Sequence, residues 1–272
     1  VGIETAHNLL IDFLWDRSYT KIYVIPPSVT KANRSRFSSS GAHDDERDAM
    51  VLADTLRTAH THLHPWAPDT VRTRQLRAEV SLHLFLTHQV VRTGNRLRSI
   101  LLRYYPAALT VFSQLTAQIT LAFIETYPTP AAAQALSYDD FAAFCRNHRY
   151  PRPKQLLECY QRLQAPQPPT AAETVMVYTE QAQQLARLLH TLVQDRDAAS
   201  ERLTSIFADH PDREMYLSLP GVGEFLAPAL AAKMGEQRTR YPSADSVQTL
   251  AGTCPVTEKS GKFRSVHFRW AC

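Results

Sequence analysis

The sequence predicts an α/β segment followed by a longer all-helical one, and three observations support this. Residues 1–67 alternate short β-branched runs with amphipathic stretches, which is typical of a mixed or parallel sheet. Residues 68–210 contain two long stretches with helical periodicity around a proline-rich helical insertion at 106–170. Residues 211–272 read as short helices separated by glycine and proline turns. We therefore expect three domains with these boundaries.

The first region should begin with a strand, because Val1, Gly2 and Ile3 form a short apolar run that ends at Glu4. A β-branched and aromatic run that Pro26 stops should be a second, buried strand. Acidic residues crowd the start of the last helix, as a helix N-terminus prefers. The expected order is a strand at 1–3, a helix at 5–17, a strand at 21–25, a basic, serine-rich loop at 31–41 and a helix at 44–57.

The middle region should contain two long helices that pair. Residues 69–105 have one glycine and no proline, and five apolar residues lie on roughly one stripe: Leu76, Val80, Leu84, Val91 and Leu101. From Val175 to Ile206, apolar residues recur at alternating steps of three and four, interrupted only by Arg196. This heptad pattern is typical of a coiled coil. The helices pair either within the chain, as an antiparallel hairpin, or with another copy.

The third region should place a turn, Leu219-Pro-Gly-Val-Gly223, between two helices, with further helices at about 224–234 and 243–250. The turn is similar to the hairpin of helix-hairpin-helix DNA-binding units, in which backbone N–H groups hold a phosphate. Gly221 and Gly223 are therefore candidate DNA contacts. A plain interhelical turn is the alternative.

Composition excludes several classes of protein. The chain has 272 residues, of which 44% are hydrophobic and 21% are charged, so neither wholesale disorder nor a collagen-like fibre is expected. No apolar run approaches the roughly 20 residues that span a bilayer, so we expect no membrane association. The first residues lack the features of a secretory signal, and four widely spaced cysteines do not predict a zinc knuckle or a disulfide scaffold. These features are consistent with a protein of the reducing cytoplasm.

The basic residues indicate a polyanion partner. The net charge is only +4, but 24 of the 30 basic residues are arginine, whose planar fork can bind phosphate through two hydrogen bonds. Residues 69–105 carry seven arginines against two acids, and residues 233–270 carry seven basic residues against three acids. Codon bias in a GC-rich genome is the alternative explanation for the arginines.

Three carboxylates are candidate metal ligands. Glu4 lies at the end of a predicted strand, where a sheet presents side chains to a crevice. Asp45 and Asp48 are three residues apart, so a helix places both on one face. Such carboxylates could hold Mg²⁺, which takes oxygen ligands, water and phosphate. N-terminal capping and compensation of the helix dipole is the alternative role for the two aspartates.

Ser260 is the candidate nucleophile. It precedes a glycine and is flanked by Lys259, Lys262 and Arg264, which could offset the negative charge that develops when a hydroxyl attacks phosphate. The surrounding sequence offers no obvious general base, and an exposed loop serine is the alternative reading. The alternating His60, His62 and His64 could form a metal site, but solvated histidines are favoured there.

Taken in order, these signals resemble one known family over nearly the whole chain. Gly2 to Pro27, Asp45-Glu-Arg-Asp-Ala49 and Leu52-Ala-Asp54 resemble the amino-terminal domain of the DEDD transposases. These form the insertion-sequence family numbered 110, described as bridge-RNA-guided recombinases. The chain also resembles the family's carboxy-terminal transposase domain. The segments that carry this resemblance are Leu219 to Gly223, Gly235, Tyr241-Pro-Ser243, Leu250-Ala-Gly-Thr-Cys-Pro255 and Ser260-Gly261.

The resemblance implies an RNase-H-like, RuvC-like domain whose four acids bind Mg²⁺, followed by a coiled coil and a domain with a serine nucleophile. Glu4 would be the second acid, Asp45 and Asp48 the third and fourth, and Ser260 the serine that becomes covalently joined to DNA. The family implies a bacterial, cytoplasmic, nucleoid-associated tetramer on donor and target DNA duplexes, with a noncoding bridge RNA pairing to both.

One departure from the family pattern bears on activity. The first acid of the family lies on a strand upstream of Val1, and the last helices lie beyond Cys272. We therefore expect an interior fragment or a gene remnant that is inactive alone. Two other functions are weighed against a recombinase: a RuvC-like structure-specific nuclease that uses water, and a helix-hairpin-helix DNA-binding protein without chemistry.

Overall fold

The computed structural model divides the chain into two compact units, Val1–Thr70 and Val71–Cys272. Each unit has its own buried apolar residues. The structure describes residues 1–6, 9–19, 21–34, 36–37 and 44–267. Among these residues, no helix has both the length and the apolar character needed to cross a membrane.

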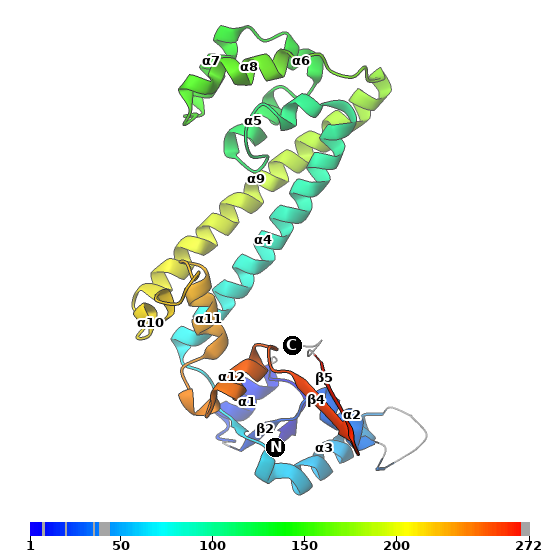
Figure 1. The fold of residues 1–272 in the computed structure, drawn as a ribbon, viewed down its shortest axis with the longest axis vertical. Coiled ribbons are helices and arrows are strands. Elements are labelled where there is room, and N and C mark those ends of the chain that lie inside the picture. Colours follow the sequence, from blue (N-terminus) through cyan, green and yellow to red (C-terminus); the bar gives the residue numbers. More distant parts are fainter. Residues whose placement is uncertain (7–8, 20, 35, 38–43, 268–272) are drawn as a thin grey trace. The chain divides into compact units, whose positions relative to one another are not determined.

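The first unit is a small α/β unit (Figure 1). It is built on a three-stranded sheet with the order β1-β2-β3. Strands β1 and β2 are parallel and β2 and β3 are antiparallel, so β1, α1 and β2 form a βαβ crossover. The elements are β1 (Gly2–Ile3), α1 (Leu9–Asp16), β2 (Ile22–Val24), α2 (Pro27–Arg34), α3 (Asp45–Ala59), η1 (His60–His62) and β3 (Pro65–Trp66). Ile3, Ile11 and Ile22 are buried together, which confirms the two predicted strands and the helix between them.

One prediction for this unit is wrong. The loop expected from Lys31 overlaps the last turn of α2, which is a helix from Pro27 to Arg34. Pro27 suits the first helical position because its missing N–H would have no partner there. The inner face of α2 carries buried Thr30 and partly buried Asn33, whose Nδ2 atom donates to Thr55 Oγ1 at 2.9 Å. The helix therefore lacks an apolar stripe. Residues 35 and 38–41 of the expected loop lie outside the described residues. The RNase-H-like fold remains a prediction.

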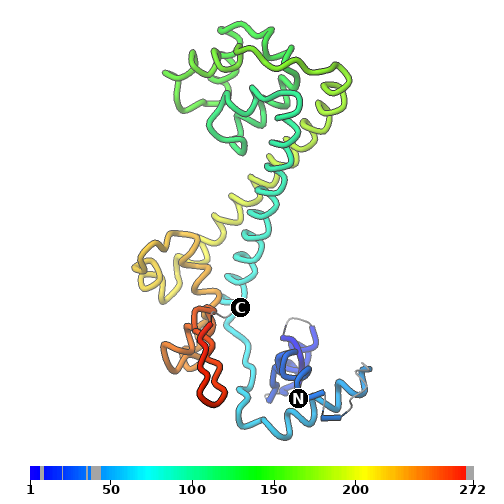
Figure 2. Tube along the Cα trace, turned by 45° about the vertical axis from the view of Figure 1, so that its right-hand side comes forward, coloured from blue at the N-terminus to red at the C-terminus, as the bar shows by residue number. Residues whose placement is uncertain are grey.

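The second unit is built on two long antiparallel helices, α4 (Val71–Tyr104) and α9 (Ala172–Ala208), which lie side by side in Figures 1 and 2. The periodicity of α9 is confirmed, since Ala182, Leu189, Ala199 and Leu203 are fully or almost fully buried. The predicted pairing therefore occurs within the chain.

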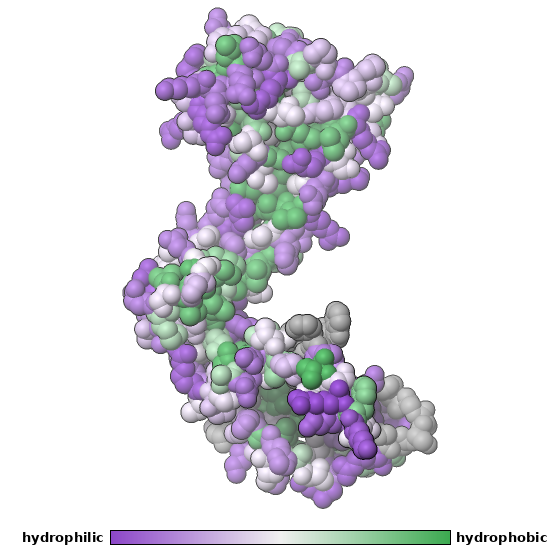
Figure 3. Space-filling view, in the orientation of Figure 1, coloured by the Kyte–Doolittle hydropathy of each residue, from purple (hydrophilic) through white to green (hydrophobic). Residues whose placement is uncertain are grey.

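The predicted stripe on α4 is wrong at two positions. Leu84 is 42% exposed and Val91 is 57% exposed, whereas Leu86 and Val90 are buried. A straight helix rotates relative to a fixed seven-residue repeat, so the residues that face the partner change along 34 residues. Hydrophobic side chains consequently remain on the surface of the helical pair, as the green areas of Figure 3 show.

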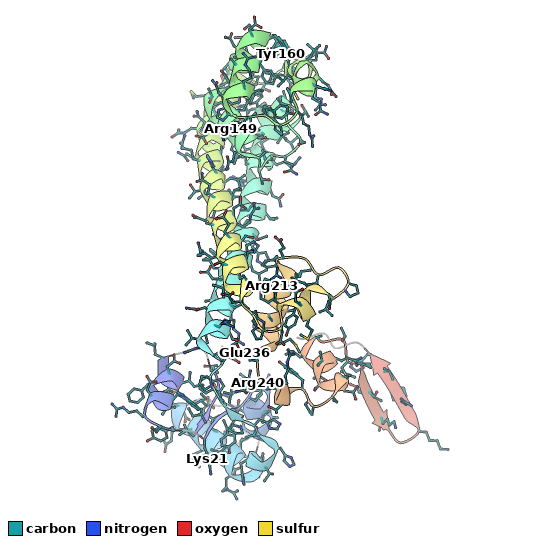
Figure 4. All side chains as sticks on the ribbon, turned by 90° about the vertical axis from the view of Figure 1, so that its left-hand side faces the viewer. Lys21, Arg149, Tyr160, Arg213, Glu236 and Arg240 are labelled. Atoms are coloured by element: carbon teal, nitrogen blue, oxygen red, sulfur yellow. The ribbon has the colours of Figure 1, made fainter. Side chains whose placement is uncertain are left out.

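A helical insertion connects α4 to α9 and packs at one end of the pair (Figure 1). The expected proline punctuation is confirmed, because Pro106, Pro130 and Pro153 each occupy the start of a helix. Phe112, Phe123 and Phe141 form an aromatic core there, and Tyr160, labelled in Figure 4, donates to the Leu136 carbonyl at 2.9 Å. The elements are η2 (Pro106–Leu109), α5 (Gln118–Thr126), α6 (Pro130–Gln134), α7 (Tyr138–Asn147), η3 (Pro153–Gln155) and α8 (Leu156–Gln164).

The carboxy-terminal elements of this unit begin against the other end of the pair. Leu76, Leu203, Tyr216 and Ala231 share a buried cluster, and Glu236, labelled in Figure 4, accepts a hydrogen bond from Thr73 at 2.8 Å. The elements are α10 (Arg213–Leu217), α11 (Leu226–Met234), η4 (Arg238–Arg240), α12 (Ala244–Leu250), β4 (Val256–Ser260) and β5 (Phe263–His267). The helices predicted at 224–234 and 243–250 are confirmed as α11 and α12.

The expectation of an all-helical carboxy-terminal region is wrong, since β4 and β5 form an antiparallel hairpin. Its turn consists of Gly261 and Lys262, and Gly261 has a φ of 59° that favours glycine. A glycine in a two-residue connection between β-branched segments is a hairpin signal, which the sequence does contain.

Acid should weaken the packing of α11 on α4 through His83. The His83 ring lies 4.3 Å from the Phe225 ring, and burial lowers the His83 pKa, as does nearby Arg196, while Asp197 partly opposes this. The His83 pKa in the folded state lies below the unfolded value of about 6.5. The neutral, partly buried His83 therefore contributes to the free energy of unfolding above pH 6.5, and this contribution is lost as the pH falls below that value. We expect the melting temperature to fall less between pH 7 and pH 5 in His83→Gln than in the wild type. His88→Gln, a matched change at an exposed histidine, should give the same pH dependence of the melting temperature as the wild type. An equal fall in melting temperature for His83→Gln and the wild type would contradict the role of His83.

Candidate active site

Two of the three predicted acids are held by one face of α2. Glu4 follows β1, and its Oε1 atom accepts a hydrogen bond from Thr30 Oγ1 at 3.2 Å. Asp48 accepts two hydrogen bonds from Arg34, one from Nε and one from Nη2, each at 2.9 Å. Thr30 and Arg34 are four residues apart on α2 and are therefore neighbours on its surface. The structure thus brings Glu4 and Asp48 to the same short stretch of helix.

The third acid, Asp45, occupies the first position of α3 and is exposed. The capping role that was the alternative for Asp45 and Asp48 belongs to Asp44, whose Oδ1 atom accepts from the Arg47 backbone N–H at 2.8 Å. Asp48, in contrast, is half-buried against Arg34. Neither predicted aspartate provides the side-chain cap.

The chemistry of these donors suits a hard cation, but their arrangement is incomplete. Carboxylate oxygens are the ligands that Mg²⁺ prefers. Within the described part of the chain, however, no three His, Cys, Asp or Glu side chains are grouped closely enough to hold a metal ion. The Arg34 guanidinium already occupies both oxygens of Asp48. The alternating His60, His62 and His64 are exposed around η1.

Ser260 is the last residue of β4 and pairs directly with Phe263 across the hairpin. It is exposed beside the turn, at the end of a strand and not in the loop of the alternative reading. Side chains alternate between the two faces of a strand, and directly paired residues share a face. Ser260 and Phe263 therefore lie on one face, and the paired Lys259 and Arg264 lie on the other.

The predicted glycine turn is present between α10 and α11. Gly221 has a φ of 75°, and the Val222 N–H donates to the Leu219 carbonyl at 3.1 Å. Apart from the glycine itself and its two chain neighbours, no heavy atom lies within 4 Å of the point where a Cβ would be at Gly221 or Gly223. Both glycines are exposed, so the turn is accessible from solvent.

Arg34 and Thr30 are the residues that sequence reasoning missed. The sequence contained a signal for them: Thr30 and Arg34 are four residues apart, and they follow Pro27, which can start a helix. Such a helix puts both residues on one face. Sequence reasoning also missed that Lys259 and Arg264 are directly paired, because the hairpin register was not predicted.

The two ends of the chain match two profiles of one class of protein. A profile of DEDD transposases of the IS110 type matches residues 3–106, which include Glu4, Asp45 and Asp48. A profile described as transposase of the IS116/IS110/IS902 family matches residues 214–272, which include the glycine turn and Ser260. The chain belongs to the IS110 family of transposases.

Curated relatives agree with this family. The protein assigned as the transposase of the IS117 mini-circle of Streptomyces coelicolor is 29% identical over 96% of this chain and 64% of its own length. A 43.6 kDa protein of the insertion element IS110 of the same organism is 28% identical over 83% of this chain and 55% of its own length. A 42 kDa protein of the element IS900 of Mycobacterium paratuberculosis is 27% identical over 80% of this chain and 54% of its own length. The chain thus spans between about half and two thirds of these relatives.

Proposed function

We propose that this chain is part of a DNA recombinase that cleaves and exchanges DNA strands through a covalent bond between Ser260 and DNA. The observation that carries the proposal is the exposed Ser260 at the end of β4, in a chain of the transposase family, with Lys259, Lys262 and Arg264 on the same hairpin. The test is the formation of a protein–DNA adduct and its loss in Ser260→Ala.

The proposed reaction begins with the hydroxyl of Ser260. Its Oγ atom attacks a backbone phosphorus, the bond from phosphorus to one bridging oxygen breaks, and that oxygen leaves as a hydroxyl after taking up a proton. A serine hydroxyl is a weak nucleophile, so removal of its proton and neutralisation of the phosphate charge are both required. Lys262, in the turn next to Ser260, can supply positive charge to that phosphate, whereas Lys259 and Arg264 lie on the opposite face of the hairpin.

We further propose that Glu4, Asp45 and Asp48 are the Mg²⁺ ligands of the first unit. A bound Mg²⁺ would polarise phosphate oxygens and lower the pKa of a coordinated hydroxyl. The support is that Glu4 and Asp48 are both held by α2, with Asp45 one turn before Asp48 on α3. Thr30 orients Glu4, and Arg34 balances the charge of Asp48 when no cation is bound.

This arrangement makes metal binding and the Arg34–Asp48 ion pair compete. We expect Arg34→Gln to strengthen Mn²⁺ binding several-fold, up to about tenfold, because a partly exposed ion pair contributes about 1 kcal/mol. Titration calorimetry on the full-length protein measures this, with Arg57→Gln as the control because Arg57 pairs with Asp54 instead. Asp48→Asn should weaken binding, and unchanged affinity in both Arg34→Gln and Asp48→Asn would contradict the site.

We also propose donor and target DNA duplexes, a bridge RNA and other copies of the chain as partners. All seven arginines between residues 69 and 105 lie on α4 and are exposed, which supports contact with a polyanion. Exposed Leu84, Phe85 and Val91 on the same helix support an oligomer, for which a tetramer is the proposed state.

A further inference from the structure

Phe263 is an exposed aromatic residue directly opposite the proposed nucleophile. The residue is 65% exposed, and its backbone pairs with Ser260 across the hairpin. The Cβ atoms of directly paired residues lie about 5 Å apart, so the ring stands next to the serine on the same face. An aromatic ring left in water at this position gains nothing from burial within its own unit.

The other face of the hairpin carries a second unusual feature. Lys259 and Arg264 are directly paired, and like charges in this position destabilise a two-stranded ladder. Both are exposed, and Lys262 in the turn adds a third cation. Two directly opposed cations are stabilised when an anion binds between or beside them, so this face is suited to phosphate.

The hairpin is also accessible. Figure 4 shows it extending away from α12, and within its own unit neither strand packs closely against another described element. Lys259 and Arg264 can neutralise other phosphates of a bound strand on their own face, while the ring on the opposite face can stack on a base beside Ser260. Phosphates neutralise cations, and the flat face of a base stacks on an aromatic side chain whatever its sequence.

From this placement we propose that Phe263 is a positioning residue that stacks on an unstacked DNA base next to the phosphate that Ser260 attacks. The inference rests on the proposed function and adds the element that fixes the scissile nucleotide. An apolar side chain that enters a base step unstacks it and holds the distorted strand in place. Because Ser260 and Phe263 are paired, a base held by the ring brings an adjacent phosphate toward the serine.

Photocrosslinking tests this contact directly. The full-length protein with its RNA and Mg²⁺ is prepared as Ser260→Ala, so that uncleaved DNA stays bound, and the DNA carries 5-iodouracil at single positions around the cleavage site. A halogenated pyrimidine crosslinks on irradiation to an aromatic ring stacked against it. We expect the crosslink to map to the peptide that contains Phe263 and to be lost when Phe263→Ala is added.

Val266 provides the matched control because it is 55% exposed on the opposite face of the same hairpin. Val266→Ala should keep the crosslink. With Ser260 present, Phe263→Ala should slow adduct formation about 10- to 100-fold, the range that base–aromatic stacking supports, and Phe263→Trp should restore it. A mismatch at the crosslinked base should also rescue Phe263→Ala, because the base is then already unstacked, whereas a purely structural role would give no such rescue.

The results separate this inference from the serine assignment. Crosslinks that map away from β5, or adduct formation at the wild-type rate in Phe263→Ala, would overturn the stacking role even when Ser260→Ala forms no adduct. Undiminished adduct formation in Ser260→Ala would instead overturn the serine mechanism, while the crosslink would still report whether a base contacts Phe263.

Discussion

Ser260→Ala in the full-length protein should lose the covalent protein–DNA adduct and reduce strand exchange by at least about a thousandfold. The reason is that removal of a nucleophile leaves only binding and charge stabilisation, which alone give a small residual rate. The loss should appear as the absence of a slower-migrating protein–DNA species in a denaturing gel. RNA binding should persist, because the change removes one exposed oxygen at the end of β4.

Ser265→Ala is the matched control, since Ser265 lies on the same face of the hairpin, opposite Glu258. It should form the adduct at close to the wild-type rate. Asp45→Ala should also lose the adduct, as Ser260→Ala does, because the acids are proposed to act in the same step. Full strand exchange by Ser260→Ala would favour a nuclease that uses water in place of the serine.

Leu189→Glu should unfold the helical pair. Leu189 is fully buried on α9 and faces Gly94 on α4. A Cβ atom built on Gly94 would lie 3.9 Å from the Cδ2 atom of Leu189. Loss of the leucine side chain costs about 2–5 kcal/mol, and burial of a carboxylate adds to this. We expect the free energy of unfolding of the second unit to fall by at least about 4 kcal/mol, measured by urea denaturation followed by circular dichroism.

Leu188→Glu is the matched control one residue away, because Leu188 is 50% exposed. It should change the free energy of unfolding by about 0.5 kcal/mol or less, as surface changes usually do. Leu185→Glu should give an intermediate loss, since Leu185 is half-buried. Equal stability of Leu188→Glu and Leu189→Glu would show that the packing face of α9 is misassigned.

The fold was predictable where apolar periodicity decides the structure. Steps of three and four identified α9, because its buried face is almost purely apolar. The same rule failed for α2, whose inner face makes polar contacts through Thr30 and Asn33. It also misplaced Leu84 on α4, because one stripe drawn over a long helix ignores its gradual rotation.

The sequence predicts which residues form the candidate site, and these remain predictions, but it does not predict how they are arranged. Glu4, Asp48 and Ser260 were identified from their chemistry and their order in the chain. The contact between Arg34 and Asp48 depends on how α2 packs on α3, which no local pattern specifies. Likewise, the pairing of Ser260 with Phe263 depends on a hairpin register set by the Gly261 turn.

Peptide mapping of the covalent adduct tests the serine mechanism most directly. The full-length protein is incubated with its RNA, DNA and Mg²⁺, denatured, and digested with nuclease and protease before mass spectrometry. The account predicts a nucleotide attached to the peptide that spans Glu258 to Lys262, with the phosphate bonded to Ser260. Cleaved DNA without any attached peptide, or attachment at a residue other than Ser260, would contradict it.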